Sequence, residues 1–206
     1  MTHPFYSSEY TGKTFKKLTL SHADIRSIEF TECRFIGCEF QEAIFRGCRF
    51  VDCEFRTCDL RMLDVTDSSF RDVRFEESQA IAIDWTGAAW GKAGLLNKIG
   101  FTRSVLNYST FVGLSLPELN LIDCLARDVD FSEADISGAK LNKTDLERSR
   151  FWNTNLTGAD LTGAFNYTID PTNNTLKQAR FSLPEAMSLL YNLDIELDDP
   201  ANHPEG

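Results

Sequence analysis

Long apolar segments are missing from this chain of 206 residues. No apolar run approaches the length of a membrane-spanning helix, which needs about 18 residues, and the chain does not begin with a basic stretch followed by an apolar one. The sequence therefore predicts neither a membrane span nor a secretory signal, and we expect the protein in the cytoplasm. The composition, with 42% apolar and 25% charged residues, is typical of a folded domain that can fill a narrow core.

Groups that carry catalysis are equally scarce. The three histidines, His3, His22 and His203, lie at or near the ends of the chain, and no glycine-rich phosphate loop or nucleophile and base set occurs. We therefore expect no enzymatic activity, no cofactor and no metal site. A basic patch with interleaved aromatic residues is also missing, and 31 acidic against 21 basic residues give a net charge of −10. This charge disfavours direct binding of nucleic acid.

What the sequence does contain is a period of five residues. Between Ile28 and Leu60 a large apolar residue recurs at every fifth position, and a small or apolar residue precedes each of them by two positions. A period of five fits neither an α-helix, which repeats after about 3.6 residues, nor a β-strand, which repeats after about 2. Extended residues two positions apart point to the same side, so these pairs face inward and the other three positions face water. The large residues are Phe30, Phe35, Phe40, Phe45, Phe50, Phe55 and Leu60.

The same frame extends through most of the chain. Central apolar positions recur from Phe15 to Trp90 and, after a shift of one residue, from Leu96 to Leu161, and 13 of the 16 phenylalanines occupy them. Coils stacked about 4.8 Å apart satisfy the backbone polar groups as a sheet does, so the sequence predicts a solenoid. We expect a cap at residues 1–12, with Phe5 and Tyr6 over the open end, and repeats at residues 13–163.

The shift of frame falls at residues 91–95. One added residue cannot be hidden in a close-packed wall, so we expect a bulge or a short projection there. Gly91, Lys92, Ala93 and Gly94 form this candidate protrusion, and the two glycines supply backbone freedom. It is either an irregularity of the rod or a contact for a partner.

All six cysteines occupy the small inward position. They are Cys33, Cys38, Cys48, Cys53, Cys58 and Cys124. Disulfides or a zinc site are the alternatives, but five-residue steps place successive sulfur atoms on different walls, whereas zinc clusters use ligands two to four residues apart. We therefore predict buried, unpaired thiols in a reducing compartment.

A different element is expected at residues 164–198. Ser182-Leu183-Pro184-Glu185 reads as a capping box, with Ser182 as the N-cap of an α-helix. This helix is apolar around most of its circumference, so it must be buried on two sides. One side is expected to close the last coil and the other to form a homodimer. The candidate interface residues are Met187, Leu189, Leu190, Tyr191, Leu193 and Ile195, and residues 199–206 are expected to be a frayed tail.

Two segments resemble a known repeat. Cys38-Glu39-Phe40-Gln41-Glu42 and Ala159-Asp160-Leu161-Thr162-Gly163 are similar to the motif of the pentapeptide-repeat family, which is Ala, Asp or Asn, Leu or Phe, and two variable residues. This resemblance implies an all-β solenoid, a right-handed quadrilateral β-helix with four repeats per coil and a C-terminal α-helix for capping and dimerisation. Thirty repeats then give a rod of about 36 Å. The ending from Ile169 to Leu197 resembles the gyrase-protecting members, of the Qnr-type quinolone-resistance and microcin-immunity types.

The second resemblance implies a function. Such relatives imitate duplex DNA with an acidic rod and bind DNA gyrase or topoisomerase IV, which protects the enzyme from quinolones or from a toxin. Half of the net charge lies in residues 164–206, which hold seven acidic and two basic residues, so the repeats are only moderately acidic. The alternative is a non-catalytic interaction solenoid with another partner. In that case the acidic residues of the repeats only keep the surface of the rod solvated. A mimic should show a continuous stripe of carboxylates. The candidate contacts are Glu76, Glu77, Asp84, Asp123, Asp128, Asp130, Glu133, Asp135 and Asp145.

Overall fold

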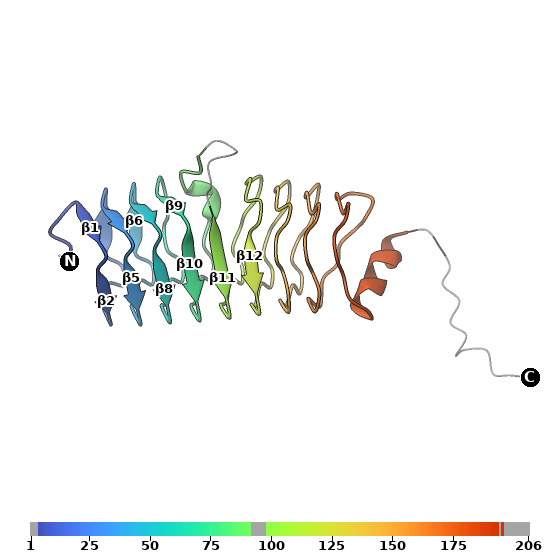
Figure 1. Ribbon diagram of the computed structural model, residues 1–206, viewed down its shortest axis with the longest axis horizontal. Helices are drawn as coiled ribbons and strands as arrows, with labels where there is room; N and C mark the ends of the chain where they lie inside the picture. Colours follow the sequence, from blue (N-terminus) through green and yellow to red (C-terminus); the bar gives the residue numbers. More distant parts are fainter. Residues whose placement is uncertain (1–3, 92–97, 194, 196–206) are drawn as a thin grey trace, which may run out of the picture.

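The protein is a rod of stacked coils. The computed structural model describes residues 4–91, 98–193 and 195, with β1 and β2 at one end and the helix η2 at the other (Figure 1). Each strand pairs in parallel with a strand of the next coil, and most register partners lie four repeats apart, such as Phe30 with Phe50 and Phe35 with Phe55. Four five-residue repeats therefore make one coil, and the expected right-handed quadrilateral β-helix is confirmed.

The regular elements are short, because each wall of a coil is only one repeat wide. Among the described residues no helix has the length and hydrophobicity needed to cross a membrane. The strands are β1 (Glu9–Thr11), β2 (Thr14–Lys16), β3 (Asp24–Arg26), β4 (Glu29–Thr31), β5 (Arg34–Ile36), β6 (Ile44–Arg46), β7 (Arg49–Val51), β8 (Glu54–Arg56), β9 (Ser69–Arg71), β10 (Val73–Glu76), β11 (Ile99–Thr102) and β12 (Asn120–Ile122), and the 3-10 helices are η1 (Trp85–Gly87) and η2 (Glu185–Asn192).

Four outward faces run along the rod. Three are named here by their first strand, and the fourth by Leu20, the central residue of its first repeat. The β1 face contains β1, β4, β7 and β9, and the β2 face contains β2, β5, β8, β10, β11 and β12. The β3 face contains β3 and β6 and continues through the bridges of Asp84, Thr110 and Asp130. The Leu20 face is defined by the parallel bridges of Thr19, Glu39, Asp59, Gln79, Val105, Leu125, Asp145 and Phe165.

The core is a ladder of aromatic and aliphatic side chains. On the β2 face the rings of Phe35 and Phe55 stack with centroids 4.6 Å apart and planes 9° apart, and Phe75 and Phe101 stack in the same way at 4.7 Å. Such stacked pairs stabilise by about 1 kcal/mol beyond the area that they bury. All six cysteines are buried and unpaired, as predicted, because the small inward position points into this core.

The N-terminal boundary lies earlier than expected. Residues 9–11 do not belong to a separate cap, because β1 pairs with β4 and sets Tyr10 opposite Phe30. The expectation that Phe5 closes the open end is confirmed, since its ring makes edge contacts with the rings of Tyr10, Phe15 and Phe30 at 5.2–5.6 Å. The same expectation for Tyr6 is wrong, because its side chain is 91% exposed.

One coil in the middle of the rod is longer than the others. Phe75 pairs with Phe101 and Asp84 with Thr110, so these register partners are separated by five repeats and one further residue instead of four repeats. The frame does shift by one residue, but the coil contains six added residues rather than one. Trp90 packs partly buried beside this point, and its Nε1 donates to the carbonyl oxygen of Trp85 at 2.7 Å. Gly91 is exposed, whereas Lys92, Ala93 and Gly94 lie outside the described residues.

The repeat register also continues past residue 163. Thr175 bridges to Asn155 and Arg180 to Asp160, each at the usual spacing of four repeats. The C-terminal helix then follows as η2, in the 3-10 form rather than the expected α form.

The expected capping box is wrong. Pro184 stands at the N-cap position without a side-chain cap. Ser182 Oγ instead accepts from the Gly163 amide at 2.9 Å, and Glu185 Oε1 accepts from the Asn166 amide at 2.5 Å. These two side chains fasten the helix to the last coil.

Candidate partner-binding surfaces

The nine candidate acids do not lie together. Because each coil has four walls, residues a few repeats apart in sequence fall on different faces, so the structure distributes the candidates around the rod. Two pairs share a column: Asp84 and Asp130, which Thr110 separates, and Glu77 and Asp123, which Arg103 separates. Glu76 lies on the β2 face and Asp145 lies on the Leu20 face, while Asp135 lies on the line of bridges that continues the β1 face. The corners with left-handed backbone hold the remaining four, which are Glu77, Asp123, Asp128 and Glu133.

The mid-rod acids Glu76 and Glu77 are neutralised by arginines of adjacent coils. Glu76 accepts from Arg56 at 2.5 Å and also contacts Arg103, which lies 3.0 Å from Glu77. The hydrogen bond from Arg56 lowers the pKa of Glu76 below its usual range. A carboxylate whose charge is already balanced attracts a basic groove weakly, so this pair is a poor substitute for phosphate.

Asp145 does not face outward as expected, and that expectation is wrong. Its carboxylate is buried, although its position in the repeat is an outward one. Oδ2 lies 2.6 Å from Arg127 Nη2, and Oδ1 accepts from Asn166 Nδ2 at 2.9 Å and from the Glu147 amide at 3.1 Å. Burial alone would raise the pKa of Asp145, but the hydrogen bonds from Asn166 and Arg127 outweigh it and the pKa is lowered. Asp145 is therefore a structural group.

The other candidate acids divide into those with and those without a cationic partner. Asp128 is held by Arg148 through two hydrogen bonds of 2.8 Å, and Asp130 lies 3.6 Å from Arg150. Within the described residues, Asp84, Asp123, Glu133 and Asp135 have no cationic partner within 4 Å. These four occupy separate positions around the rod and do not form the continuous stripe expected of a mimic.

A continuous acidic row exists elsewhere and was not predicted. Glu32, Asp52 and Asp72 occupy equivalent corners of three successive coils, with φ angles of 54°, 51° and 53°. Neighbouring coils are about 4.8 Å apart, so the three carboxylates follow one line parallel to the rod. None of the three makes an ion pair with another described residue. Their spacing of four repeats was the available signal, once four repeats are assigned to each coil.

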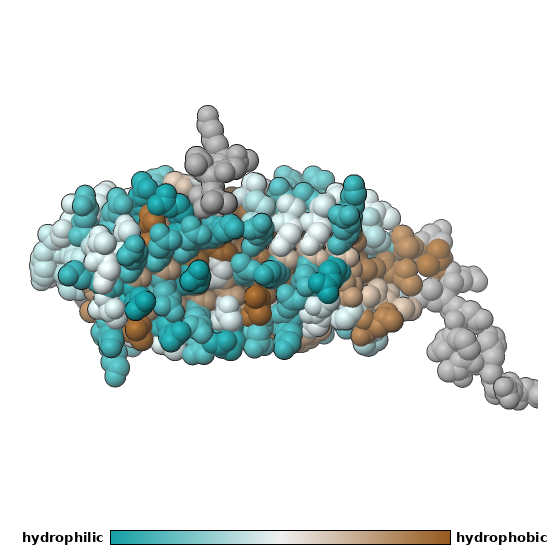
Figure 2. Space-filling view, in the orientation of Figure 1, coloured by the Kyte–Doolittle hydropathy of each residue, from teal (hydrophilic) through white to brown (hydrophobic). Residues whose placement is uncertain are grey.

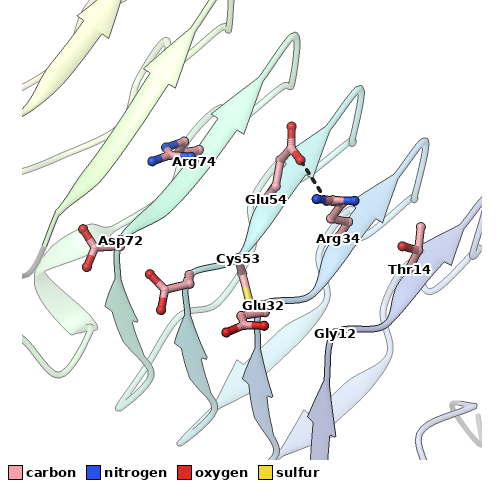
Figure 3. Close-up of a pocket in the computed structure, with 9 residues that line it drawn as sticks. Gly12, Thr14, Glu32, Arg34, Cys53, Glu54, Asp72 and Arg74 are labelled. Carbon is pink, nitrogen blue, oxygen red and sulfur yellow. Dashed lines mark ion pairs between the residues drawn. The ribbon is translucent and has the colours of Figure 1, made fainter.

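This acidic row forms one bank of a groove of about 390 Å³ (Figure 3). The opposite bank carries Arg34 and Arg74 with Glu54 between them, and Arg34 Nε lies 3.6 Å from Glu54. Arg74 extends from β10, and its guanidinium makes no ion pair or hydrogen bond with the described residues. The groove therefore combines free carboxylates with one free guanidinium.

The C-terminal end of the rod exposes four apolar side chains, which are called here the exposed row. They are Leu183, Met187, Tyr191 and Ile195, and they are 77%, 39%, 75% and 52% exposed. Figure 2 shows this apolar surface beyond the last coil, in contrast to the largely polar rod. Of the other expected interface residues, Leu189 packs partly buried against the core, and Leu190 and Leu193 are half-buried. An apolar end of this kind is typical of an interface.

Comparisons with known proteins agree with this architecture. Two family models match the chain: one described as a pentapeptide repeat region over residues 28–98, and one described as pentapeptide repeats (8 copies) over residues 118–153 and 130–165. None of the curated protein sequences is similar enough to this chain to count as a match.

The solved structures of QnrB1, described as a plasmid-mediated fluoroquinolone resistance protein, are similar in fold. One trypsin-treated variant is 24% identical with a TM-score of 0.62, covering 93% of this chain and 92% of its own. A second trypsin-treated variant is 21% identical with a TM-score of 0.69, covering 93% and 97%. The full-length form is 20% identical with a TM-score of 0.56, covering 91% and 100%.

Proposed function

The chain belongs to the pentapeptide-repeat family, and from this premise we propose that it binds a type II DNA topoisomerase, DNA gyrase or topoisomerase IV, as an acidic imitation of duplex DNA. On this proposal the bound rod protects the enzyme from quinolones or from a gyrase-targeting toxin. The protein acts in the cytoplasm by binding and not by catalysis. The observation that carries the proposal is the similarity of fold to QnrB1 over 93% of this chain.

The acidic row supports this proposal with a physical mechanism. Duplex DNA presents a line of phosphates to a basic groove, and a rod with free carboxylates on successive coils presents charges of the same sign along a line. Glu32, Asp52 and Asp72 are better placed for this role than Glu76, Glu77, Asp128 and Asp145, whose charges are balanced by arginine. We therefore assign the main electrostatic contact to this row, with Asp84, Asp123, Glu133 and Asp135 as secondary contacts.

A homodimer is part of the same proposal. The exposed row of Leu183, Met187, Tyr191 and Ile195 lies at the end of the rod, where a second copy can approach without obstructing the four faces. Two such ends buried against each other satisfy the requirement that a self-complementary interface uses the same patch twice. The dimer would be an elongated rod of twice the length, which suits an imitation of a DNA segment.

Gyrase supercoiling tests the proposal directly. Purified gyrase is assayed on relaxed plasmid with an inhibitory quinolone, with and without a molar excess of the protein. Recovery of supercoiling in the presence of the protein supports the proposal. If the protein neither restores activity nor binds gyrase or topoisomerase IV at low ionic strength, the proposal is wrong.

The alternative is a non-catalytic interaction solenoid with a different partner. The observation that favours it is the dispersion of the nine candidate acids over all faces, because a dedicated mimic would be expected to concentrate them. The two functions separate in a pull-down from lysate at low and physiological salt. A topoisomerase contact weakens strongly with salt, whereas an apolar contact does not.

A further inference from the structure

The outer column of side chains on the β2 face has a gap at Gly100. Register pairing places Arg74, Gly100 and Asn120 in line on β10, β11 and β12, and places Glu76, Thr102 and Ile122 in line beside them. Every other strand of this sheet carries a side chain at the position equivalent to Gly100, from Thr14 through Arg34 and Glu54. The missing side chain leaves a depression of about 310 Å³ in the wall of the rod.

The depression has the make-up of a small binding site. It is lined by the bare backbone of Gly100, by the apolar side chains Phe75 and Ile122, and by the polar side chains Glu54, Arg74, Glu76, Thr102 and Asn120. The neighbouring carboxylates are already balanced, because Glu76 pairs with Arg56 and Glu54 pairs with Arg34 and Arg56. Among the charged side chains that line the depression, Arg74 alone is unbalanced, since its guanidinium makes no ion pair or hydrogen bond with the part of the chain that the structure describes. An apolar floor with a few unsatisfied polar groups is typical of a pocket that receives an anchoring side chain.

We propose that this depression is an anchor site for a partner protein segment in which an apolar side chain is followed or preceded by a carboxylate. The apolar side chain fills the space above Gly100 and covers Ile122, and the carboxylate binds Arg74. Charge complementarity selects this occupant, because the free group on the rim is a guanidinium, which binds carboxylates in a bidentate geometry. The site shares Arg74 with the groove beside the acidic row, and the proposal does not require that the partner is a topoisomerase.

A substitution at Gly100 closes the site without a backbone penalty. The backbone there is not in the left-handed region, and an added Cβ would meet the Cβ of Asn120 at 3.3 Å, so that side chain must give by a few tenths of an ångström. Gly100→Val suits a β-strand and fills the depression. Arg74→Gln removes the charge and keeps the cavity. Arg34→Gln is the matched control, because Arg34 occupies the equivalent column two coils earlier and does not line the depression. Glu54, which does line it and pairs with Arg34, still has Arg56 as an ion-pair partner at 3.3 Å in this variant.

The probe is the capped tripeptide acetyl-Asp-Leu-Asp-amide, titrated into the full-length, ¹⁵N-labelled protein while the backbone amide signals of Thr102 and Ile122 are followed. We expect saturable shifts at these two amides, and binding about tenfold weaker for acetyl-Asn-Leu-Asn-amide, because a charge-assisted contact is lost. Arg74→Gln should lose this preference between the two peptides, Gly100→Val should lose the shifts, and Arg34→Gln should behave as the parent protein.

Three results would overturn the proposal. The first is the absence of saturable shifts at Thr102 and Ile122. The second is an equal response to the two peptides in the parent protein, or an equal effect of Arg74→Gln and Arg34→Gln. The third concerns the chain's own ending, in which Leu197 lies between two acids and so resembles the peptide. If Leu197→Ser changes the Thr102 and Ile122 signals in the absence of peptide, the depression is filled by this ending and not by a partner protein.

Discussion

Asp145 and Arg127 form an ion pair of 2.6 Å between adjacent coils, and the Asp145 side chain is only 1% exposed. Asp145 also accepts from Asn166 on the following coil. One carboxylate on an outward wall thus joins three successive coils. A solenoid depends on contacts between neighbouring coils because it has few contacts between distant ones, so this group stabilises the C-terminal half of the rod.

Asp145→Asn should destabilise the protein by about 1–2 kcal/mol, because the neutral amide no longer forms an ion pair with Arg127 and accepts its hydrogen bonds more weakly. The measurement is urea unfolding followed by circular dichroism at neutral pH. Asp123→Asn is the control, since Asp123 is exposed at a left-handed corner with no cationic partner among the described residues. Equal stability of the two variants would contradict the structural role of Asp145.

The difference between the parent protein and Asp145→Asn should depend on pH. The pKa of Asp145 is lowered in the folded state, so its stabilising effect is complete above the ordinary aspartate pKa of about 3.9. It is lost as the pH falls through the lower folded-state pKa, because the folded state must then take up a proton that the unfolded state has already bound. The two unfolding curves should therefore converge in acid, whereas the Asp123→Asn curve should follow the parent protein throughout.

The cysteine thiols should react only after unfolding. All six thiols are buried, so a reagent cannot reach them in the folded protein. Burial also raises the pKa of Cys53 to about 12 and that of Cys124 to about 11, so the reactive thiolate of these two is scarce at neutral pH. The hydrogen bond with Cys58 lowers the pKa of Cys38 to about 7, so Cys38 is protected by its burial alone. Labelling with a disulfide reagent should be slow in the native protein and should reach all six thiols in denaturant. Rapid labelling of several cysteines in the native protein would contradict the packing of the small inward position.

The added residues of the mid-rod coil should be removable as a block of six. Deleting residues 92–97 restores the spacing of four repeats between register partners, so Gln79 and Val105 keep their bridge. We expect the deletion variant to keep the parent circular dichroism spectrum and to unfold in one transition. Deleting five residues instead leaves one extra residue in the coil, which must bulge from a close-packed wall and should make this variant the less stable of the two. Equal behaviour of the two deletions would mean that the register is wrong.

The sequence predicted which residues of each repeat face inward, but it did not predict the number of residues in the mid-rod coil. A frame of five residues defines positions only up to a multiple of five, so an insertion of six residues and one of a single residue look alike between Trp90 and Leu96. The pairing of Phe75 with Phe101 distinguishes them. The start of the rod at Tyr10 was available from the sequence, because Phe5, Tyr10 and Phe15 are five residues apart, but the basic repeat around Lys13 concealed it.

The candidate site was harder to predict than the fold. Inward positions are fixed by their own residue type, whereas the state of an outward acid depends on residues of the neighbouring coil, about four repeats away in the sequence. Glu76 is neutralised by Arg56, and Asp145 by Arg127, and neither relation is visible within one repeat. The row of Glu32, Asp52 and Asp72 is likewise a property of three coils together.

The dimer should depend on the exposed row at the rod's end. Tyr191→Ser and Leu183→Ser remove the two most exposed apolar side chains of this row and should shift the protein from dimer to monomer in sedimentation at micromolar concentration. Met62→Ser is the control, because Met62 is also exposed, at 57%, but lies at a corner of the early coils. A parent protein that sediments as a monomer would rule out this interface.

The acidic row should dominate the contact with the topoisomerase. Replacing Glu32 by Gln and Asp52 and Asp72 by Asn removes three free charges from one line. The fold should be retained, since these corner side chains make no ion pairs with described residues and Asn adopts the left-handed region readily. Binding to gyrase should weaken about tenfold at low salt, because each exposed charge contributes only a fraction of a kcal/mol but the three act together. The difference in affinity between the parent protein and this variant should narrow as salt rises.

The matched variant is Glu76→Gln with Glu77→Gln, which removes two carboxylates already balanced by Arg56 and Arg103 and should change binding less. If the variant of Glu76 and Glu77 weakens gyrase binding more than the variant of Glu32, Asp52 and Asp72, the enzyme does not recognise the acidic row. The contact must then be assigned to the β2 face.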